Sequence, residues 1–423
     1  MKTLKPASEK QIYIWNIIGS MLNALLSVLL LMIASLLLSD RETDIFSLGW
    51  SFAMQAMTVG TFQVRLYQST DVEEKYSFNQ YLIFRVLTVL AMFIYSAVYL
   101  HLSGYHFQKV LIIFLVCVAR SADVFSDLFQ GWFQQKERLD LAGKAFSAHS
   151  ASIIIVFVLT VLFSKNLLIA CFFMIVGNYL MLFLFDLRYF LIAKQAFGKQ
   201  ATKSTKNFLL KLILDCLPIF INAYIIMEIF NKPRFAIDGA ISAGQLPDGS
   251  QKIYGVLFLP ASALTLVFIV FRPLITQLAI QWNNNNRSGF LRIIKSISLY
   301  LLLISVVIVA VGYFLGCPVL SFVYNVELNG FKNVLLIIIV GGLFNTFLYL
   351  FDNAITVIRC HSYLIIAYLV TWIYTVFTVD AFVKNHGILG GALCFASSML
   401  LLLICTAIIF FICISKRKPN HNH

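Results

Sequence analysis

Long apolar stretches recur along the whole of this 423-residue sequence, and they constrain its fold more than any other feature. A stretch of roughly 18 or more apolar residues is long enough, as an α-helix, to cross the hydrocarbon core of a bilayer. Charged residues make up only 12% of the chain, whereas a soluble globular domain carries roughly 25%. The sequence therefore predicts an all-α polytopic membrane protein.

We predict twelve transmembrane helices from these stretches. They cover approximately residues 12–38, 43–66, 79–102, 107–130, 146–164, 167–190, 207–229, 251–275, 290–313, 333–353, 361–383 and 386–414. A lysine-rich segment, 194–211, follows the sixth stretch and is typical of a cytoplasmic linker. We expect this linker to join an N-terminal six-helix lobe, 1–193, to a C-terminal six-helix lobe, 212–423, which ends in a short basic tail.

Lysine and arginine are distributed unevenly between the predicted loops. With the N-terminus placed inside, 22 of the 32 basic residues lie in inside segments and 8 lie outside. Cytoplasmic loops carry the excess of Lys and Arg, so both termini are predicted to be cytoplasmic. The formal charge of +13 is then a topology signal rather than a sign of nucleic-acid binding. The eight cysteines lie in or beside apolar stretches, and we interpret them as core residues, not as disulfides.

The segment 116–144 places ionisable residues inside an apolar stretch. Arg120 lies about midway along it, and Asp123 and Asp127 follow at i+3 and i+7, on one helical face. A lipid-facing arginine would cost ~2.5–3.5 kcal/mol or more, so this face must look into protein or into a water-filled cavity. Two interpretations stay open: an internal Arg–Asp clasp that holds helices together, and a cationic site in a transport path.

Arg65 and Arg85 lie nearer to the predicted cytoplasmic side than Arg120 does. Arginine binds phosphate oxygens in a bidentate fork, so the three side chains could draw an anionic headgroup inward if they converge on one cavity. The alternative for Arg65 and Arg85 is that they extend to the lipid headgroups.

Uncharged polar residues also follow helical faces in the first two predicted spans. Asn16 and Asn23 share one face of the first span, and Gln55 lies on a face of the second span that ends at Arg65. These amides either line a hydrated cavity or join neighbouring helices by hydrogen bonds.

The C-terminal half carries buried carboxylates instead of midspan arginines. Asp215 and Asp352 are candidates for ion coupling, because buried carboxylates can carry protons; internal hydrogen bonding is the alternative. Arg272 closes the eighth span (FIVFRPLITQ) as Arg65 closes the second (TFQVRLYQ), which fits a six-helix repeat. Arg272 is therefore a further candidate for substrate binding.

Four stretches make the chain resemble bacterial polysaccharide-repeat-unit flippases of the Wzx type, in the multidrug/oligosaccharidyl-lipid/polysaccharide exporter superfamily. They are IYIWNIIGSMLNALLSVLL (12–30), GTFQVRLYQSTDVEEKYSFNQYLIFR (60–85), DVFSDLFQGWFQQKERLDLAGK (123–144) and NKPRFAIDGAIS (231–242). The resemblance implies two six-helix lobes around a central cavity and translocation of an undecaprenyl-diphosphate-linked oligosaccharide across the bacterial plasma membrane, with ion coupling. It also implies that the cavity is lined by Asn16, Asn23, Arg65, Arg85, Arg120, Asp123 and Asp127.

Three functions remain in competition. The first is a flippase for capsule or another surface polysaccharide; the second is a cation-coupled multidrug exporter of the same fold; the third is a membrane-embedded polysaccharide polymerase. A midspan arginine disfavours cationic drugs, and the short loops disfavour an enzyme. We therefore expect no catalytic residue, no cofactor and no metal. The expected partners are the lipid-linked oligosaccharide, membrane lipids and polysaccharide assembly proteins, not nucleic acid, and we expect a monomer.

Overall fold

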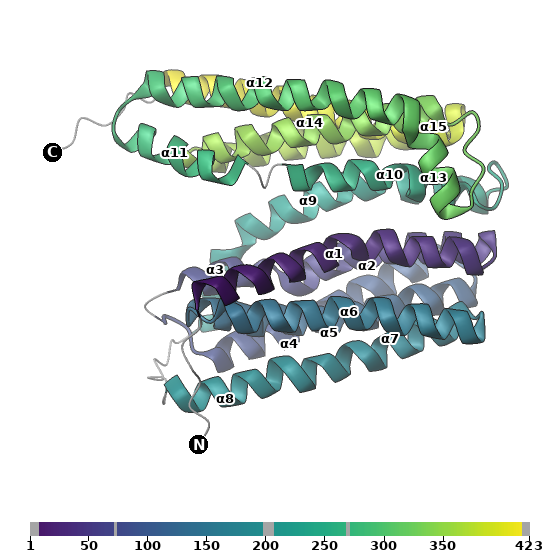
Figure 1. The fold of residues 1–423 in the computed structure, drawn as a ribbon, viewed down its shortest axis with the longest axis horizontal. Coiled ribbons are helices and arrows are strands. Elements are labelled where there is room, and N and C mark those ends of the chain that lie inside the picture. Colours follow the sequence, from purple (N-terminus) through teal and green to yellow (C-terminus); the bar gives the residue numbers. More distant parts are fainter. Residues whose placement is uncertain (1–7, 72–73, 198–206, 268–270, 417–423) are drawn as a thin grey trace. The chain divides into compact units, whose positions relative to one another are not determined.

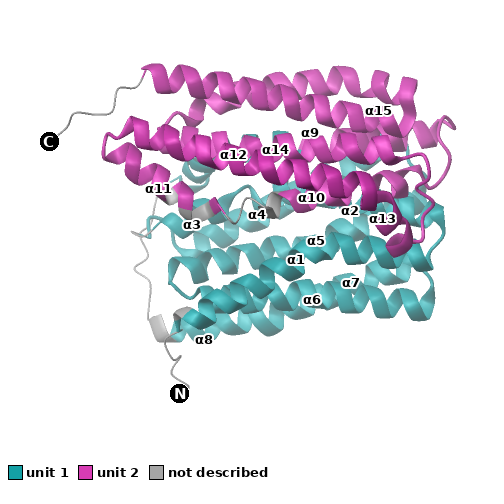
Figure 2. Ribbon diagram, turned by 45° about the horizontal axis from the view of Figure 1, so that its top comes forward, with its two compact units in different colours: residues 1–227 teal, residues 228–423 magenta. Residues whose placement is uncertain are grey.

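The computed structural model describes residues 8–71, 74–197, 207–267 and 271–416. These residues form helices joined by turns, and no strand occurs among them. The chain packs into two compact units, Met1–Met227 and Glu228–His423, which Figure 2 colours separately.

Unit 1 is a helical bundle (Figure 1). Its elements are α1 (Glu9–Leu37), α2 (Asp40–Thr61), α3 (Val64–Thr70), α4 (Phe78–Leu102), α5 (Phe107–Gln135), α6 (Leu139–Ser164), α7 (Leu167–Met181), the π-helix η1 (Leu182–Leu187), α8 (Arg188–Phe197) and the first part of α9 (Phe208–Ser242). Helix α5 is the central element, because it packs against α2, α3, α4, α6, α7 and η1.

Unit 2 continues from α9. It contains α10 (Ser250–Val267), α11 (Arg272–Asn283), α12 (Arg287–Val311), the π-helix η3 (Gly312–Gly316), α13 (Cys317–Tyr324), α14 (Lys332–Val357), the short 3₁₀ turn η4 (His361–Tyr363) and α15 (Leu364–Lys416). Helix α15 is two helices joined at Gly387, whose backbone (φ 57°, ψ −132°) is not helical. In this unit α14 packs against both α10 and α15.

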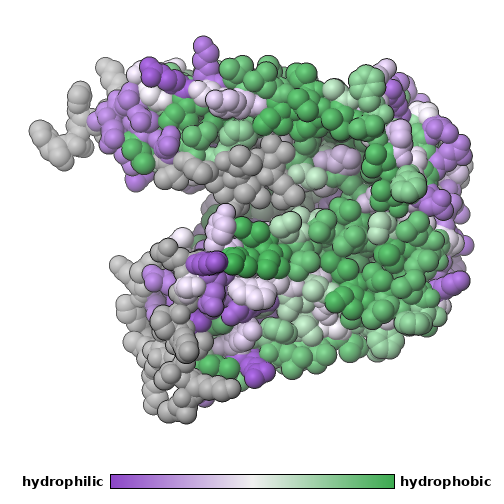
Figure 3. Space-filling model, viewed as in Figure 1, coloured by the Kyte–Doolittle hydropathy of each residue, from purple (hydrophilic) through white to green (hydrophobic). Residues whose placement is uncertain are grey.

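The prediction of an all-α protein with twelve spans in two six-helix lobes is confirmed. Each predicted span overlaps one long helix, with α7 to α8 forming the sixth span and the two halves of α15 forming the last two. Eight helical stretches of the described chain are long and apolar enough, by length and composition, to cross a membrane. On the face that Figure 3 shows, hydrophobic residues lie between more hydrophilic ends, as a lipid-facing surface requires.

Close helix packing in unit 1 depends on small residues. A Cβ atom added to Gly143 of α6 would lie 2.7 Å from the carbonyl carbon of Trp15 on α1, so only glycine allows these two backbones to approach. At one end of the unit, aromatic rings replace small residues. Phe78 stacks on Phe190 at 4.2 Å, and the edge of Trp132 meets the same ring at 4.9 Å.

The second predicted span, 43–66, is interrupted in the structure. Helix α2 ends at Thr61, and both Phe62 and Gln63 adopt left-handed backbone conformations, with φ of 45° and 53°. A right-handed helix cannot continue through such residues. Phe62 stacks on Phe220 at 4.3 Å, a contact that supports the break. Arg65 therefore lies on the separate short helix α3 and not on the same helix as Gln55.

The predicted lobe boundary is not tested by this arrangement. Of the predicted linker 194–211, residues 198–206 lie outside the described part of the chain. Helix α9 is continuous from Phe208 to Ser242 and passes through the division between the two units.

Candidate functional site

Arg120 is buried in unit 1, with 4% of its side chain exposed. Its Nη1 donates to Asp123 Oδ2 at 2.8 Å, and its guanidinium carbon lies 5.0 Å from the centre of the Trp50 ring. Its Nη2 lies 3.4 Å from the sulfurs of Met54 and Met57. Its Nε has no hydrogen-bond partner among the described residues. Arg120 and Asp123 thus form an ion pair within α5 rather than a clasp between two helices, and the Nε atom of Arg120 is left unsatisfied.

Arg85 and Arg65 meet at Asp127. The Arg85 side chain is fully buried and donates to the Gly60 carbonyl at 2.8 Å and to Asp127 Oδ2 at 2.9 Å. Arg65 Nη1 donates to Gln130 Oε1 at 2.8 Å and lies 3.6 Å from Asp127 Oδ1, with 33% of its side chain exposed. Two of the three predicted arginines therefore share one carboxylate.

Arg120 does not join this pair, because it uses Asp123. The two carboxylates are four residues apart on α5, which corresponds to a rise of about 6 Å along the helix. Together the two neighbouring clusters contain three guanidinium groups and two carboxylates. The guanidinium groups thus outnumber the carboxylates by one. Because burying a charge without a counter-charge is costly, binding of an anionic ligand here would be favourable.

The predicted amide residues have different environments. Gln55 is buried and its Nε2 donates to Tyr95 Oη at 2.9 Å. Asn16 Nδ2 donates to the Leu139 carbonyl at 3.3 Å, which joins α1 to α6. Asn23 is exposed on the surface of α1. The structure thus gives Gln55 and Asn16 partners inside unit 1 and leaves Asn23 accessible.

Asp215, one predicted ion-coupling residue, belongs to an ion pair at the end of unit 1. Its Oδ2 accepts from Lys75 Nζ at 3.1 Å and from Tyr76 Oη at 3.1 Å. Lys75 lies in the loop before α4, and its hydrogen bonds with Tyr67 and Asp215 raise its pKa above the usual lysine value. The lysine therefore stays charged at physiological pH and holds α9 to this loop.

Asp352, the other predicted ion-coupling residue, lies in unit 2. Its Oδ2 accepts from Tyr368 Oη at 2.8 Å, which joins α14 to α15. Arg272 is the first residue of α11, and its side chain lies outside the described part of the structure.

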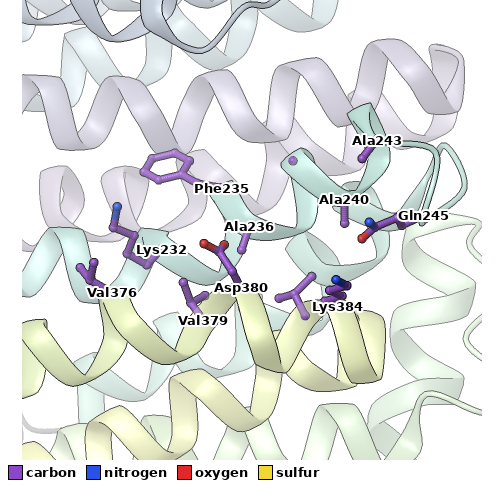
Figure 4. Close-up of a pocket in the computed structure, with 12 residues that line it drawn as sticks. Lys232, Phe235, Ala236, Ala240, Ala243, Gln245, Val376, Val379, Asp380 and Lys384 are labelled. Carbon is purple, nitrogen blue, oxygen red and sulfur yellow. The ribbon is translucent and has the colours of Figure 1, made fainter.

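Unit 2 also contains an open cavity of about 400 Å³ between α9 and α15 (Figure 4). Lys232, Asp380 and Lys384 contribute its charged groups, and Gln245 lies at its rim. Lys232 Nζ is 3.0 Å from Glu228 Oε1 on its own helix. Sequence analysis did not select this cavity, because its residues come from two segments that are far apart in the sequence.

Sequence analysis also missed a buried histidine beside Arg120. His149 on α6 contacts Asn178 on α7 and Asp186 on η1, and its Nδ1 lies 3.5 Å from Asp123 Oδ1. The available signal was the presence of polar residues within the apolar stretches 146–164 and 167–190.

No model of a known protein family matches the sequence, and no curated protein matches it either. Solved structures do match over nearly the full length. An inward-facing multidrug resistance MATE family transporter of the MOP superfamily aligns with a TM-score of 0.67 and 14% identity, covering 93% of this chain and 94% of the other. The lipid II flippase MurJ, in an inward closed conformation, aligns with a TM-score of 0.63 and 14% identity, covering 93% and 87%.

The chain has the fold of the MOP-superfamily transporters. A further structure of this fold is a MOP superfamily transporter from Pyrococcus furiosus, described as having a binding pocket of reverse polarity. It aligns with a TM-score of 0.57 and 13% identity, covering 98% of each chain. These structures are described as transporters and a flippase. At such low identity the likeness establishes the fold and leaves the substrate open.

Proposed function

We propose that the chain is a flippase that moves undecaprenyl-diphosphate-linked oligosaccharide repeat units from the inner to the outer leaflet of the bacterial plasma membrane. It would serve the assembly of capsule or another surface polysaccharide. The observation that carries this proposal is the positive charge on and around α5, where the three guanidinium groups of Arg65, Arg85 and Arg120 form ion pairs with two carboxylates, Asp123 and Asp127.

The three arginines would have different roles. Arg65 is part-exposed and would make the first contact with the diphosphate. Arg120 would bind it after exchanging Asp123 for a phosphate oxygen, since guanidinium binds both in the same bidentate manner. Arg85 is fully buried, so it would act by holding Asp127 in place. Asn16, Asn23 and Gln55 would hydrogen-bond the sugars, and Arg272 would contribute from unit 2.

Alternating access would arise from rocking of the two lobes about the predicted linker, 194–211. Asp215 and Asp352 remain candidates for coupling this movement to an ion gradient. Both carboxylates have hydrogen-bond partners that a change in protonation would release.

A multidrug exporter is the competing function, and the likeness to MATE transporters favours it. The aromatic group of Phe52, Tyr95 and Tyr99 would suit an apolar drug, since the Phe52 ring lies 5.8 Å and 4.8 Å from the two tyrosine rings. Most cationic drugs would nevertheless be repelled by the surplus arginine. Another transporter of this fold is described as having a binding pocket of reverse polarity. We therefore infer the substrate class from the charge of the site and not from the fold.

The test of the proposal uses a strain that lacks the chromosomal copy of the gene. Arg65→Gln is expected to lower surface polysaccharide by about 10-fold to 100-fold, because losing a charged hydrogen bond costs ~1.5–3 kcal/mol. Arg65→Lys should retain part of the activity. The control is Arg41→Gln, because Arg41 is an exposed arginine in the first turn of α2. Lipid-linked repeat units should accumulate in the cytoplasmic leaflet at equal expression.

A second pair of variants tests Arg120 separately from folding. Arg120→Gln leaves Asp123 buried without its cation, so it is compared with Arg120→Gln combined with Asp123→Asn, which removes both charges. Both variants should fail to restore surface polymer. Full restoration by the double variant would exclude Arg120 from substrate binding, and altered drug resistance without any change in polymer would favour the exporter.

A further inference from the structure

The contacts of His149 require a proton on each side of its ring. The side chain is 1% exposed. Its Nδ1 lies 2.5 Å from Asn178 Oδ1, and its Nε2 lies 2.7 Å from Asp186 Oδ2. A neutral imidazole has one N–H and one bare nitrogen, whereas both neighbours here are oxygen atoms.

The orientation of Asn178 is fixed by its other contacts. Its Nδ2 donates to the Ala119 carbonyl at 2.8 Å and to Asp123 Oδ2 at 2.9 Å. The reversed amide would place an oxygen against both of these acceptors. Asn178 Oδ1 therefore faces His149 as an acceptor, and the Nδ1 of His149 must be the donor.

The contact between His149 and Asp186 then depends on one additional proton. Asp186 Oδ1 already accepts from Ser126 Oγ, whose own acceptor role is filled by Gln130 Nε2. With Nδ1 protonated, Nε2 and Asp186 Oδ2 can approach to 2.7 Å only if a proton lies between them. Without it, a lone pair would face a fully buried carboxylate, which is strongly unfavourable.

The titratable and charged groups around this pair come from several elements. Helix α8, which packs against η1, begins with Arg188 and Tyr189, and Arg188 is exposed. Helix α5 contributes Asp123, which is paired with Arg120; α7 contributes the uncharged Asn178; and η1 contributes Asp186. Helix α1, which also packs against α6, has no titratable residue from Ile14 to Leu37. The 2.7 Å contact between His149 Nε2 and Asp186 Oδ2 leaves no space for a metal ion between them. The described part of the chain contains no cluster of three or more His, Cys, Asp or Glu side chains that could hold a metal ion.

We propose that His149 and Asp186 form a proton-binding site in unit 1, which binds and releases one proton shared between Nε2 and the carboxylate. The π-helix η1 supports a functional assignment, because an isolated π-turn within a helix is frequent at functional sites. Release of the proton leaves one more negative charge beside α5.

Two hydrogen-bonded paths connect this site to the arginines. On one side, Asn178 accepts from His149 and donates to Asp123, which also accepts from Arg120. On the other, Asp186 is joined through Ser126 and Gln130 to Arg65. On the basis of the proposed function, the protonated site makes unit 1 more positive and favours binding of the diphosphate. By linkage, diphosphate binding then favours uptake of the proton.

The proton site is tested by nuclear magnetic resonance on full-length protein in liposomes, with ¹⁵N-labelled histidine and ¹³C-labelled aspartate. The chain has seven histidines, and His149→Gln identifies the signal of His149. At neutral pH we expect a ring with both nitrogens protonated, or a ring hydrogen-bonded to a protonated Asp186. We expect this proton to be lost between neutral and strongly alkaline pH, because the buried carboxylate stabilises the protonated state. Asp186→Asn should abolish this titration. A His149 signal that is constant over the whole range would overturn the proposal.

The link to the arginines is tested by adding undecaprenyl diphosphate to purified protein in weak buffer. Wild-type protein should take up about one proton or less per chain on binding, and His149→Gln and Asp186→Asn should take up none. Binding is measured calorimetrically in the same samples. Equal uptake in all three proteins would contradict the link. If the lipid does not bind the wild type, the proposed function fails, while the resonance experiment still decides the proton site.

Discussion

At the scale of single residues, burial separates the three arginines into different roles. Arg85 has no exposed side-chain surface and donates to the Gly60 carbonyl and to Asp127, whereas Arg65 is one-third exposed. A buried ion pair contributes little over an apolar pair, but removing one partner leaves an uncompensated charge. Arg85 is therefore expected to matter for stability, and Arg65 for ligand binding.

Arg85→Met should lower the free energy of unfolding by about 3–5 kcal/mol, because it leaves Asp127 with only the longer contact to Arg65. Arg65→Met should cost about 1 kcal/mol or less. Thermal denaturation of the detergent-solubilised protein measures both changes, with Arg41→Met as an exposed control. Equal melting temperatures for the Arg85 and Arg65 variants would contradict this division.

Sequence analysis found the partners that lie on one helix and missed those that depend on tertiary contacts. Arg120 and Asp123 pair within α5, where residues three apart are neighbours. The sequence left this pairing open beside a cationic site in a transport path. The same spacing placed Asp127 beside Arg120, yet Asp127 is taken by Arg65 and Arg85 from other helices. No local sequence pattern specifies that Asp127 pairs with arginines from other helices.

At the scale of elements, irregular backbone explains why some side chains meet although helical periodicity does not place them on one face. Asn178 and Asp186 are eight residues apart, so a regular α-helix would turn them about 80° away from one another. The π-helix at 182–187 inserts one residue between them and returns both side chains to His149. The break at Phe62–Gln63 likewise separates Arg65 from α2. Hydropathy locates such helices but does not reveal a local change of helical pitch.

The bend in α15 gives a test of irregular backbone in unit 2. Gly387 has a φ of 57° and a ψ of −132°, a conformation that residues with a Cβ rarely adopt. Gly387→Ala should therefore destabilise the protein by about 1–3 kcal/mol. Gly239→Ala is the matched control, because an added Cβ on this helical glycine meets nothing within 4 Å; it should be neutral or stabilising by up to ~1 kcal/mol. Thermal denaturation compares the stabilities of the two variants. Equal melting temperatures would show that the backbone at Gly387 can change conformation without a cost in stability.

At the scale of the whole molecule, sequence was sufficient for the twelve spans because hydropathy is a local property. The central cavity predicted between the lobes remains a prediction, because it depends on contacts that no local pattern encodes. The division of charge between the units is informative nevertheless. Unit 1 has buried arginines around α5, and unit 2 has an open cavity with Lys232 and Lys384. The proposed transport of an anionic lipid would use cationic groups at successive points of a path, and both units contain such groups.

Lys384 tests whether the cavity of unit 2 belongs to the transport path. Its side chain is exposed, so Lys384→Gln should leave the melting temperature unchanged. If the cavity receives the diphosphate or its sugars, surface polysaccharide should fall about 2-fold to 5-fold, as expected for an exposed charge worth up to ~1 kcal/mol. Lys295→Gln, at an exposed lysine on α12 of the same unit, is the matched control. Wild-type polymer from Lys384→Gln, together with a defect in Arg65→Gln, would restrict substrate recognition to unit 1. A defect in both single variants would instead support a transport path that includes both units.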